Sequence, residues 1–218
     1  MIKLIIYDLD GTLIDSRRDI ADAVNWTLKE LGLGELPMER VSAFVGSGVK
    51  NLMRHALEET KVEPSPFLGR SIKLFRRRYG EHLLDHTLLY PPVRKVLEFF
   101  KERKQAVITN KPEDFSLEIL QGLGIHSYFF RVVGGDRGFP KKPAPESLLE
   151  ILRETRTSPQ EAILVGDSAI DIETGRNAGV KTLGVTYGFG SREEIQRSRP
   201  DGILDDLEEL IPCRLLKA

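Results

Sequence analysis

Short apolar segments rich in Val and Ile recur along the chain, and from residue 90 onward they alternate with stretches that carry apolar residues at helical spacing. Segments of this length and composition are typical of buried strands. Their alternation with helices predicts an α/β fold, in which a Rossmann-like parallel sheet is covered by helices on both faces. The predicted strands span residues 3–7, 104–109, 131–134, 162–166 and 181–186.

Residues 16–83 interrupt this alternation. The segments DIADAVNWTLKELG and GVKNLMRHALEET have apolar residues at the spacing of an α-helix, and no convincing strand lies among them. Pro91 and Pro92 then favour a break in the chain and a new helix start. We therefore predict an inserted, all-helical cap at residues 15–83, on a core that is formed by residues 1–14 and 84–218.

Length and charge narrow the functional classes. The 218 residues can bury one substantial core and support a small second domain. With 32 Lys+Arg against 33 Asp+Glu, the net charge of -1 provides no general attraction to nucleic acid or to an anionic membrane. The single cysteine, Cys213, fits a reducing compartment, and Asp8 and Asp10 interrupt the apolar stretch that a signal peptide requires. We expect a soluble, cytoplasmic protein with a small-molecule partner, and the oligomeric state stays open between monomer and homodimer.

Polar side chains follow four of the predicted strands. Ligands of parallel α/β sheets bind beyond the carboxyl ends of the strands, so these positions are the candidates for a site. Alternate side chains of an extended segment point the same way, so Asp8 and Asp10 share one side of the chain while Leu9 faces the core. The candidates are Asp8 and Asp10, Thr109 and Asn110, Lys142, and Asp167 and Asp171.

Carboxylates that share a pocket repel one another, by about 4 kcal/mol for a pair about 4 Å apart at an effective dielectric constant near 20. Asp8, Asp10 and Asp167 form several such pairs, which Lys142 alone cannot neutralise. A cluster of oxygen ligands selects a hard cation such as Mg²⁺, which also accepts a phosphate oxygen. Asp8 can then attack phosphorus, while Asp10 protonates the leaving oxygen and later activates water. The donors for the phosphoryl group are Thr109, Asn110 and Lys142.

Four motifs, in order along the chain, resemble those of the haloacid dehalogenase superfamily of phosphohydrolases. They are DLDGTL at 8–13, TN at 109–110, Lys142 in KKPAPE, and GDSAIDIETGRNAG at 166–179. The resemblance implies that Asp8 is the nucleophile and a metal ligand, and that Asp10 is the general acid/base and also gives its backbone carbonyl to the metal. It further implies a phosphate contact for Thr109, a Mg²⁺ ligand in Asp167, and a residue in Asp171 that tunes the metal site or Lys142.

Other segments are similar to the phosphoglycolate phosphatases within that superfamily, and this likeness covers nearly the whole chain. They are DGTLIDSRRDIADAVN, VGSGVKNLM, TNKP, GGDRGFPKKPAPESL and SRPDGILDDLEEL. The resemblance implies hydrolysis of 2-phosphoglycolate to glycolate and phosphate through an aspartyl-phosphate.

Discrimination among substrates must come from the cap, because the core motifs contact only the phosphoryl group. The segment GSGVK at 46–50 offers the N–H groups of a helix start at Gly48, together with the cation Lys50, to a substrate carboxylate. Arg17 or Arg18 could supply the cation instead, and Gly48 could mark no more than a helix break. The spacing of a dinucleotide-binding motif is absent, so no nucleotide cofactor is predicted.

Each candidate also has a structural interpretation. An Asp or a Thr-Asn pair after a strand can cap a helix or turn, and Asp171 can be an ordinary acid in the first turn of a helix. Lys142 could be a surface residue like its neighbour Lys141, although Pro143 completes the Lys-Pro pair of the family motif. The presence of all four motifs in register favours the catalytic interpretation.

Two functional alternatives stay open. A phospho-acceptor domain of a signalling protein also combines an acidic pocket, a Thr and a Lys on a parallel sheet, but the acid/base Asp10 and the large cap argue against it. A sugar-phosphate mutase or a pyrophosphatase of the same superfamily could share every core motif. A dehalogenase is disfavoured, because that reaction needs neither Mg²⁺ nor an acid/base at the position of Asp10.

Overall fold

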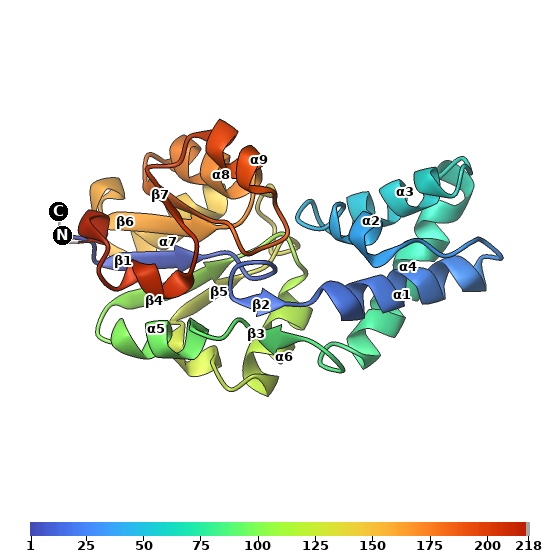
Figure 1. Cartoon of the computed structure of the whole chain (residues 1–218), viewed down its shortest axis with the longest axis horizontal. Helices are drawn as coiled ribbons and strands as arrows, with labels where there is room; N and C mark the ends of the chain where they lie inside the picture. The colour runs from blue at the N-terminus through green and yellow to red at the C-terminus, as the bar shows by residue number, and fades with distance from the viewer. Residues whose placement is uncertain (217–218) are drawn as a thin grey trace.

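Six parallel strands form the central sheet of the computed structural model, which describes residues 1–216 (Figure 1). The strand order is β5-β4-β1-β6-β7-β8, and every neighbouring pair is parallel. The bounds are Leu4–Tyr7 for β1, Lys104–Ile108 for β4, Arg131–Val133 for β5, Ala162–Gly166 for β6, Lys181–Val185 for β7 and Gly202–Leu204 for β8.

Helices cover both faces of this sheet, which confirms the predicted α/β fold. Alternate residues of β1 point to opposite faces, so Ile5 and Tyr7 belong to one buried cluster while Leu4 and Ile6 belong to the other. The first cluster includes residues of α5 (Val93–Phe99) and α6 (Glu113–Gly122), and the second includes residues of α7 (Glu146–Thr155) and α8 (Ala169–Ala178). The remaining elements of the core are α9 (Arg192–Ser198) and the short 3₁₀ helices His126–Tyr128, Pro159–Glu161, Leu207–Leu210 and Arg214–Leu216.

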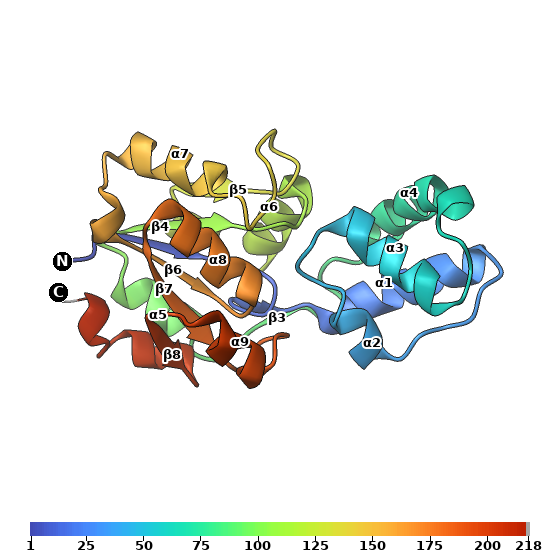
Figure 2. The same cartoon turned by 90° about the horizontal axis from the view of Figure 1, so that it is seen from above.

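Four further helices lie beyond the carboxyl end of the sheet, on the side to which the arrow of β1 points, while the N-terminus lies at the opposite end of the core (Figures 1 and 2). The chain leaves the core through β2 (Ile14–Asp15) and returns through β3 (Leu88–Leu89), and these two strands pair antiparallel. We propose that residues 15–83 form the cap and residues 1–14 and 84–218 the core, of which 217–218 lie outside the described residues. The four helices are α1 (Arg17–Glu30), α2 (Met38–Ser42), α3 (Val49–Glu59) and α4 (Ser65–Glu81).

The five predicted strands are all present, and their ends agree with the prediction to within one residue. The strands β2 and β3 were not predicted, because two residues are too few to show a pattern, and the three-residue strand β8 was also missed. Pro92 directly precedes α5, and Gly48 precedes α3 with a φ of 85°, so both predicted helix starts are confirmed. Over residues 1–216, none of the helices combines the length and the apolar composition that a membrane crossing requires.

The strand order also determines where a ligand site is expected. From β1 the chain proceeds to β4 and β5 on one side, and then continues with β6 on the other side of β1. The crevice at such a reversal of strand order, beyond the carboxyl ends of the strands, is where open α/β sheets bind ligands. The residues that follow β1, β4 and β6 therefore meet beneath the four helices.

Candidate active site

Three buried carboxylates gather where β1 and β6 end. Asp8 follows β1 and Asp167 follows β6, and the register of these neighbouring strands pairs Tyr7 with Val165, so their ends lie side by side. Asp171 lies in the first turn of α8. One carboxylate oxygen from each of the three lies within 4.8 Å of the other two. The structure thus brings Asp8 and Asp167 together, but the third carboxylate of the cluster is Asp171 and not Asp10, which the sequence had placed there.

Close packing by glycine fixes the position of Asp167. A Cβ atom on Gly11 would lie 2.1 Å from Asp167 Oδ2, and the φ of +82° at Gly11 also disfavours any other residue. Asp167 Oδ2 accepts a hydrogen bond of 2.7 Å from the N–H of Phe189, and Thr12 donates its hydroxyl to Oδ1 at 3.3 Å. The sharp turn after Asp10 is therefore what allows the loop after β1 to pass against the carboxylate from β6.

Lys142 is the cation of this cluster. Its Nζ lies 2.8 Å from Asp8 Oδ1 and 2.6 Å from Asp171 Oδ1, and the side chain is buried. Burial disfavours the charged amine, but Asp171 and Asp8 outweigh it and raise the pKa of Lys142, which keeps its charge. Asp171 also accepts hydrogen bonds from the backbone and hydroxyl of Ser168, so it caps α8 and pairs with Lys142 at once. Lys141, in contrast, is exposed.

Full ionisation of the three carboxyl groups would give the cluster more negative charge than Lys142 can neutralise. Burial raises the pKa of Asp8 to about 7, against the lowering effect of Lys142. Burial, followed by repulsion from Asp171 and Asp8, raises the pKa of Asp167 to about 8. Buried carboxylates with raised pKa values are stabilised by a bound cation, and an all-oxygen donor set fits Mg²⁺. The residues present therefore fit the metal that the sequence predicts.

Thr109 and Asn110 follow β4 and line the same cavity as Asp8. The hydroxyl oxygen of Thr109 accepts from the N–H of Lys111 at 3.2 Å, and within residues 1–216 its own hydrogen has no acceptor, so it can donate to a ligand. The side chain of Asn110 is engaged with backbone: its Oδ1 accepts from the N–H of Lys142 at 2.9 Å, and its Nδ2 donates to the carbonyls of Lys142 and Gly46. Asn110 thus positions Lys142 and links the core to the loop before α3, rather than presenting its amide to phosphate.

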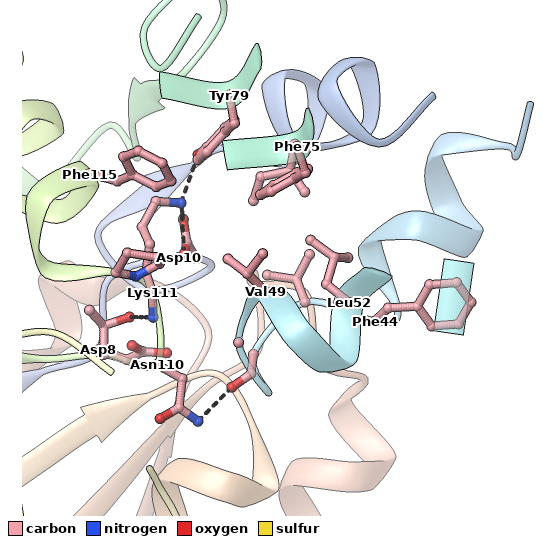
Figure 3. A pocket seen from close by; sticks show the side chains of 16 residues that line it. Asp8, Asp10, Phe44, Val49, Leu52, Phe75, Tyr79, Asn110, Lys111 and Phe115 are labelled. Carbon is pink, nitrogen blue, oxygen red and sulfur yellow. Dashed lines mark hydrogen bonds and ion pairs between the residues drawn. The ribbon is translucent and has the colours of Figure 1, made fainter. Parts of the chain in front are cut away.

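Asp10 faces away from the acidic cluster and toward a second lysine. Its Oδ1 accepts from the hydroxyl of Ser16 at 2.5 Å, and Lys111 Nζ lies 2.9 Å from Oδ1 and 3.1 Å from Oδ2. Lys111 also donates to the hydroxyl oxygen of Tyr79 on α4, at 2.7 Å (Figure 3). Sequence reasoning did not identify Lys111 or Tyr79. Lys111 has a signal, since it lies two residues beyond Thr109 at a strand end, whereas Tyr79 matches the apolar face of a helix.

A cavity of about 40 Å³ separates these core residues from the helices above them. Its floor contains Asp8, Asp10 and Thr109, and Figure 3 shows apolar side chains facing them from the helical side. A substrate that reaches Asp8 would therefore be enclosed by a polar floor and a largely apolar cover. The apolar lining residues on the helical side are Ile20, Phe44, Val45, Val49, Leu52 and Phe75.

The structure does not place Lys50 in the cavity, where the sequence predicted it. Gly46, Gly48 and Val49 line the cavity, but Lys50 is exposed and is not among its lining residues. Successive residues of an α-helix are rotated by roughly 100° about its axis, so a helix that directs Val49 into the cavity directs Lys50 elsewhere. Neither alternative cation lines the cavity: Arg17 pairs with Asp15, and Arg18 is exposed beside Asp22.

Comparisons with known proteins agree with this geometry. A model of the family described as haloacid dehalogenase-like hydrolase matches residues 5–185. A phosphoglycolate phosphatase of Aquifex aeolicus is 40% identical over 86% of this chain and 86% of its own, and one of Vibrio parahaemolyticus is 38% identical over 96% and 95%. The crystal structure of a predicted phosphoglycolate phosphatase from Haemophilus somnus superposes with a TM-score of 0.92, at 32% identity over 97% of both chains.

Proposed function

Because the chain belongs to the haloacid dehalogenase-like hydrolase family, we propose that it is a Mg²⁺-dependent phosphate monoester hydrolase whose substrate is 2-phosphoglycolate. The observation that carries the chemistry is the meeting of Asp8, Lys142 and Asp167 at the end of β1, with Asp10 two residues after Asp8 in the chain. The substrate assignment is supported by the relatives that are phosphoglycolate phosphatases and match 86% or more of the chain.

In this proposal Asp8 is the nucleophile. One of its carboxylate oxygens forms a bond to phosphorus while the bond from phosphorus to the ester oxygen breaks, which leaves an aspartyl-phosphate. Lys142 contacts Asp8, and its positive charge stabilises the phosphoryl group during the transfer. The hydroxyl of Thr109 donates a hydrogen bond to one of the phosphoryl oxygens. Asn110 holds the backbone of Lys142 in place.

Asp10 transfers the protons both in the formation and in the hydrolysis of the aspartyl-phosphate. It gives a proton to the ester oxygen as that oxygen leaves, so that glycolate departs as the neutral alcohol at that position. It then takes a proton from the water that attacks phosphorus. The bond between phosphorus and the Asp8 oxygen breaks in this step, so that phosphate is released and the Asp8 carboxylate is restored. The pair formed with Lys111 and the hydrogen bond from Ser16 fix the orientation of Asp10 for this role.

The metal would be held by the side chains of Asp8 and Asp167 and by the backbone carbonyl of Asp10. When bound, Mg²⁺ supplies positive charge to the phosphoryl oxygens and offsets the repulsion among the buried carboxylates. The apolar side chains of the cap exclude water from the cavity until the leaving group has departed, and the strands β2 and β3 provide the two crossings at which the cap can move.

A substrate panel tests this function. Phosphate release by the purified protein is measured with 2-phosphoglycolate, a hexose phosphate, a nucleotide, pyrophosphate and an aryl phosphate, each with Mg²⁺ and with excess chelator. We expect the highest kcat/KM for 2-phosphoglycolate and no turnover in chelator. Better turnover of another compound would refute the glycolate assignment alone. A single turnover followed by a stable phosphoprotein would identify a phospho-acceptor domain, and undiminished activity in chelator would refute the metal requirement.

A further inference from the structure

Lys111 is the only cationic side chain among the residues that line the cavity, as far as residues 1–216 are concerned. It is buried, with 7% of its surface exposed, and it comes from the core, two residues after Thr109. The cover opposite it is largely apolar (Figure 3). An anionic leaving group inside this cavity therefore meets Lys111 and no other lining cation.

Tyr79 adds a second donor beside this lysine. The hydroxyl oxygen of Tyr79 accepts from Lys111 Nζ at 2.7 Å, and within the described part of the chain its own hydrogen has no acceptor. Tyr79 is 1% exposed and lines the cavity, with its ring stacked on Phe75 and its edge against Phe115. A rigid O–H group and a charged amine are thus presented together at the edge of the cavity.

We propose that Lys111 and Tyr79 bind the carboxylate of the leaving group and thereby select short phospho acids, an inference that rests on the proposed function. In 2-phosphoglycolate the carboxylate is attached to the carbon that carries the ester oxygen. Asp10 is the residue that protonates that oxygen, and Lys111 lies 2.9 Å from Asp10. The carboxylate of a substrate in this position therefore lies next to the amine of Lys111.

The apolar side chains that cover the cavity also favour a short phospho acid over a sugar phosphate. A hexose phosphate would place several hydroxyl groups against Phe44, Leu52 and Phe75, none of which can form a hydrogen bond with them. A buried hydroxyl without a partner is unfavourable, whereas a two-carbon acid has no such group beyond its carboxylate. The leaving group that fits this cavity is thus short, with one anionic end.

The test compares two substrates that differ in the carboxylate alone. The values of kcat and KM are measured with Mg²⁺ for 2-phosphoglycolate and for ethyl phosphate, in the wild type and in Lys111→Met, Lys111→Arg and Tyr79→Phe. Lys73→Met is the control, because Lys73 is exposed on the same helix as Tyr79 and lies outside the cavity. Thermal denaturation of each variant shows whether it is folded.

We expect Lys111→Met to lower kcat/KM for 2-phosphoglycolate by roughly 10- to 100-fold more than for ethyl phosphate, mainly through KM, because a charged hydrogen bond to the carboxylate is lost. Lys111→Arg should retain part of the preference, Tyr79→Phe should lower it by roughly 3- to 10-fold, and Lys73→Met should leave it unchanged. If Lys111→Met does not fold, the other two variants give the same comparison.

An equal loss for both substrates in Lys111→Met would mean that Lys111 acts only on Asp10, and would overturn the proposal. A wild type that hydrolyses both esters without preferring 2-phosphoglycolate would also overturn it, while leaving the phosphatase chemistry standing. A wild type that hydrolyses neither ester would refute the proposed function itself.

Discussion

Lys111 Nζ lies 2.9 Å from Asp10 Oδ1, and both side chains are buried where the core meets the helices. Burial disfavours the charge of Lys111, but Asp10 and Tyr79 outweigh it and raise the pKa of the lysine, so the amine stays protonated. A buried pair of this kind restricts the orientation of both partners. Asp10, the proposed general acid/base, therefore has a defined orientation, and the same lysine connects it to Tyr79 on α4.

Asp10→Asn should separate proton transfer from binding. We expect steady-state turnover of 2-phosphoglycolate to fall by roughly 10²- to 10⁴-fold, the usual contribution of a general acid/base, while the affinity for substrate is retained. An aryl phosphate, whose leaving group needs no proton, should still give a rapid first release of the aryl alcohol. The measurement is a burst experiment with both substrates. Wild-type turnover of 2-phosphoglycolate by the variant would contradict the role of Asp10.

The stabilisation by Mg²⁺ should increase with pH. The pKa values of Asp8 and Asp167 are raised to about 7 and about 8, so without metal their protonated forms favour the folded state, and this contribution is lost as the pH rises through those values. Mg²⁺ binds the ionised carboxylates, so its effect on Tm should be larger at about pH 8 than at about pH 5. Thermal denaturation at both pH values measures this, with Asp167→Asn as the control that lacks a ligand. A shift that is equal at both pH values would contradict the assigned ligands.

Asp19 should stabilise the crossing between cap and core. Its carboxylate is buried and accepts hydrogen bonds from the N–H groups of His86 and Thr87 and from the hydroxyl of Thr87. Although burial opposes the charge, these bonds lower the pKa of Asp19, so its contribution is present above about pH 4 and is lost as the pH falls through the lowered value. Asp19→Asn should reduce the free energy of unfolding at neutral pH by about 1–3 kcal/mol.

Urea denaturation at neutral and at acidic pH measures this effect. Asp22→Asn is the matched control, because Asp22 is exposed one turn further along α1 and should change stability by less than about 0.5 kcal/mol. The difference in stability between Asp19→Asn and the wild type should shrink in acid. A constant difference at both pH values would mean that the charge of Asp19 does not contribute.

The elements that were predicted from sequence are those whose signal is local. Val- and Ile-rich segments bounded by polar residues located five of the strands, and the polar residues that follow these strands include Asp8, Thr109 and Asp167. The Lys-Pro pair led to Lys142 rather than Lys141, and the structure places Lys142 beside Asp8. The strands follow from local patterns, whereas the choice of Lys142 rests on the resemblance to the family motif.

The features that were missed depend on partners far along the chain. Lys111 is separated from Asp10 by 101 residues and from Tyr79 by 32, and no local pattern shows that these three side chains meet. The helix start at Gly48 was predicted, but the direction of the Lys50 side chain depends on how α3 is rotated against the core. Pairing of β2 with β3 likewise joins two short segments that flank the cap.

The most direct test of the central claim is to detect the phosphoryl group on Asp8. The Asp10→Asn variant is mixed with Mg²⁺ and an aryl phosphate and quenched in acid within the burst, and its peptides are analysed by mass spectrometry. We predict a phosphoryl group on the peptide that contains Asp8, and none in Asp8→Asn, which should be folded but inactive. Turnover by Asp8→Asn, or a modification at any other residue, would contradict the assignment of Asp8 as the nucleophile.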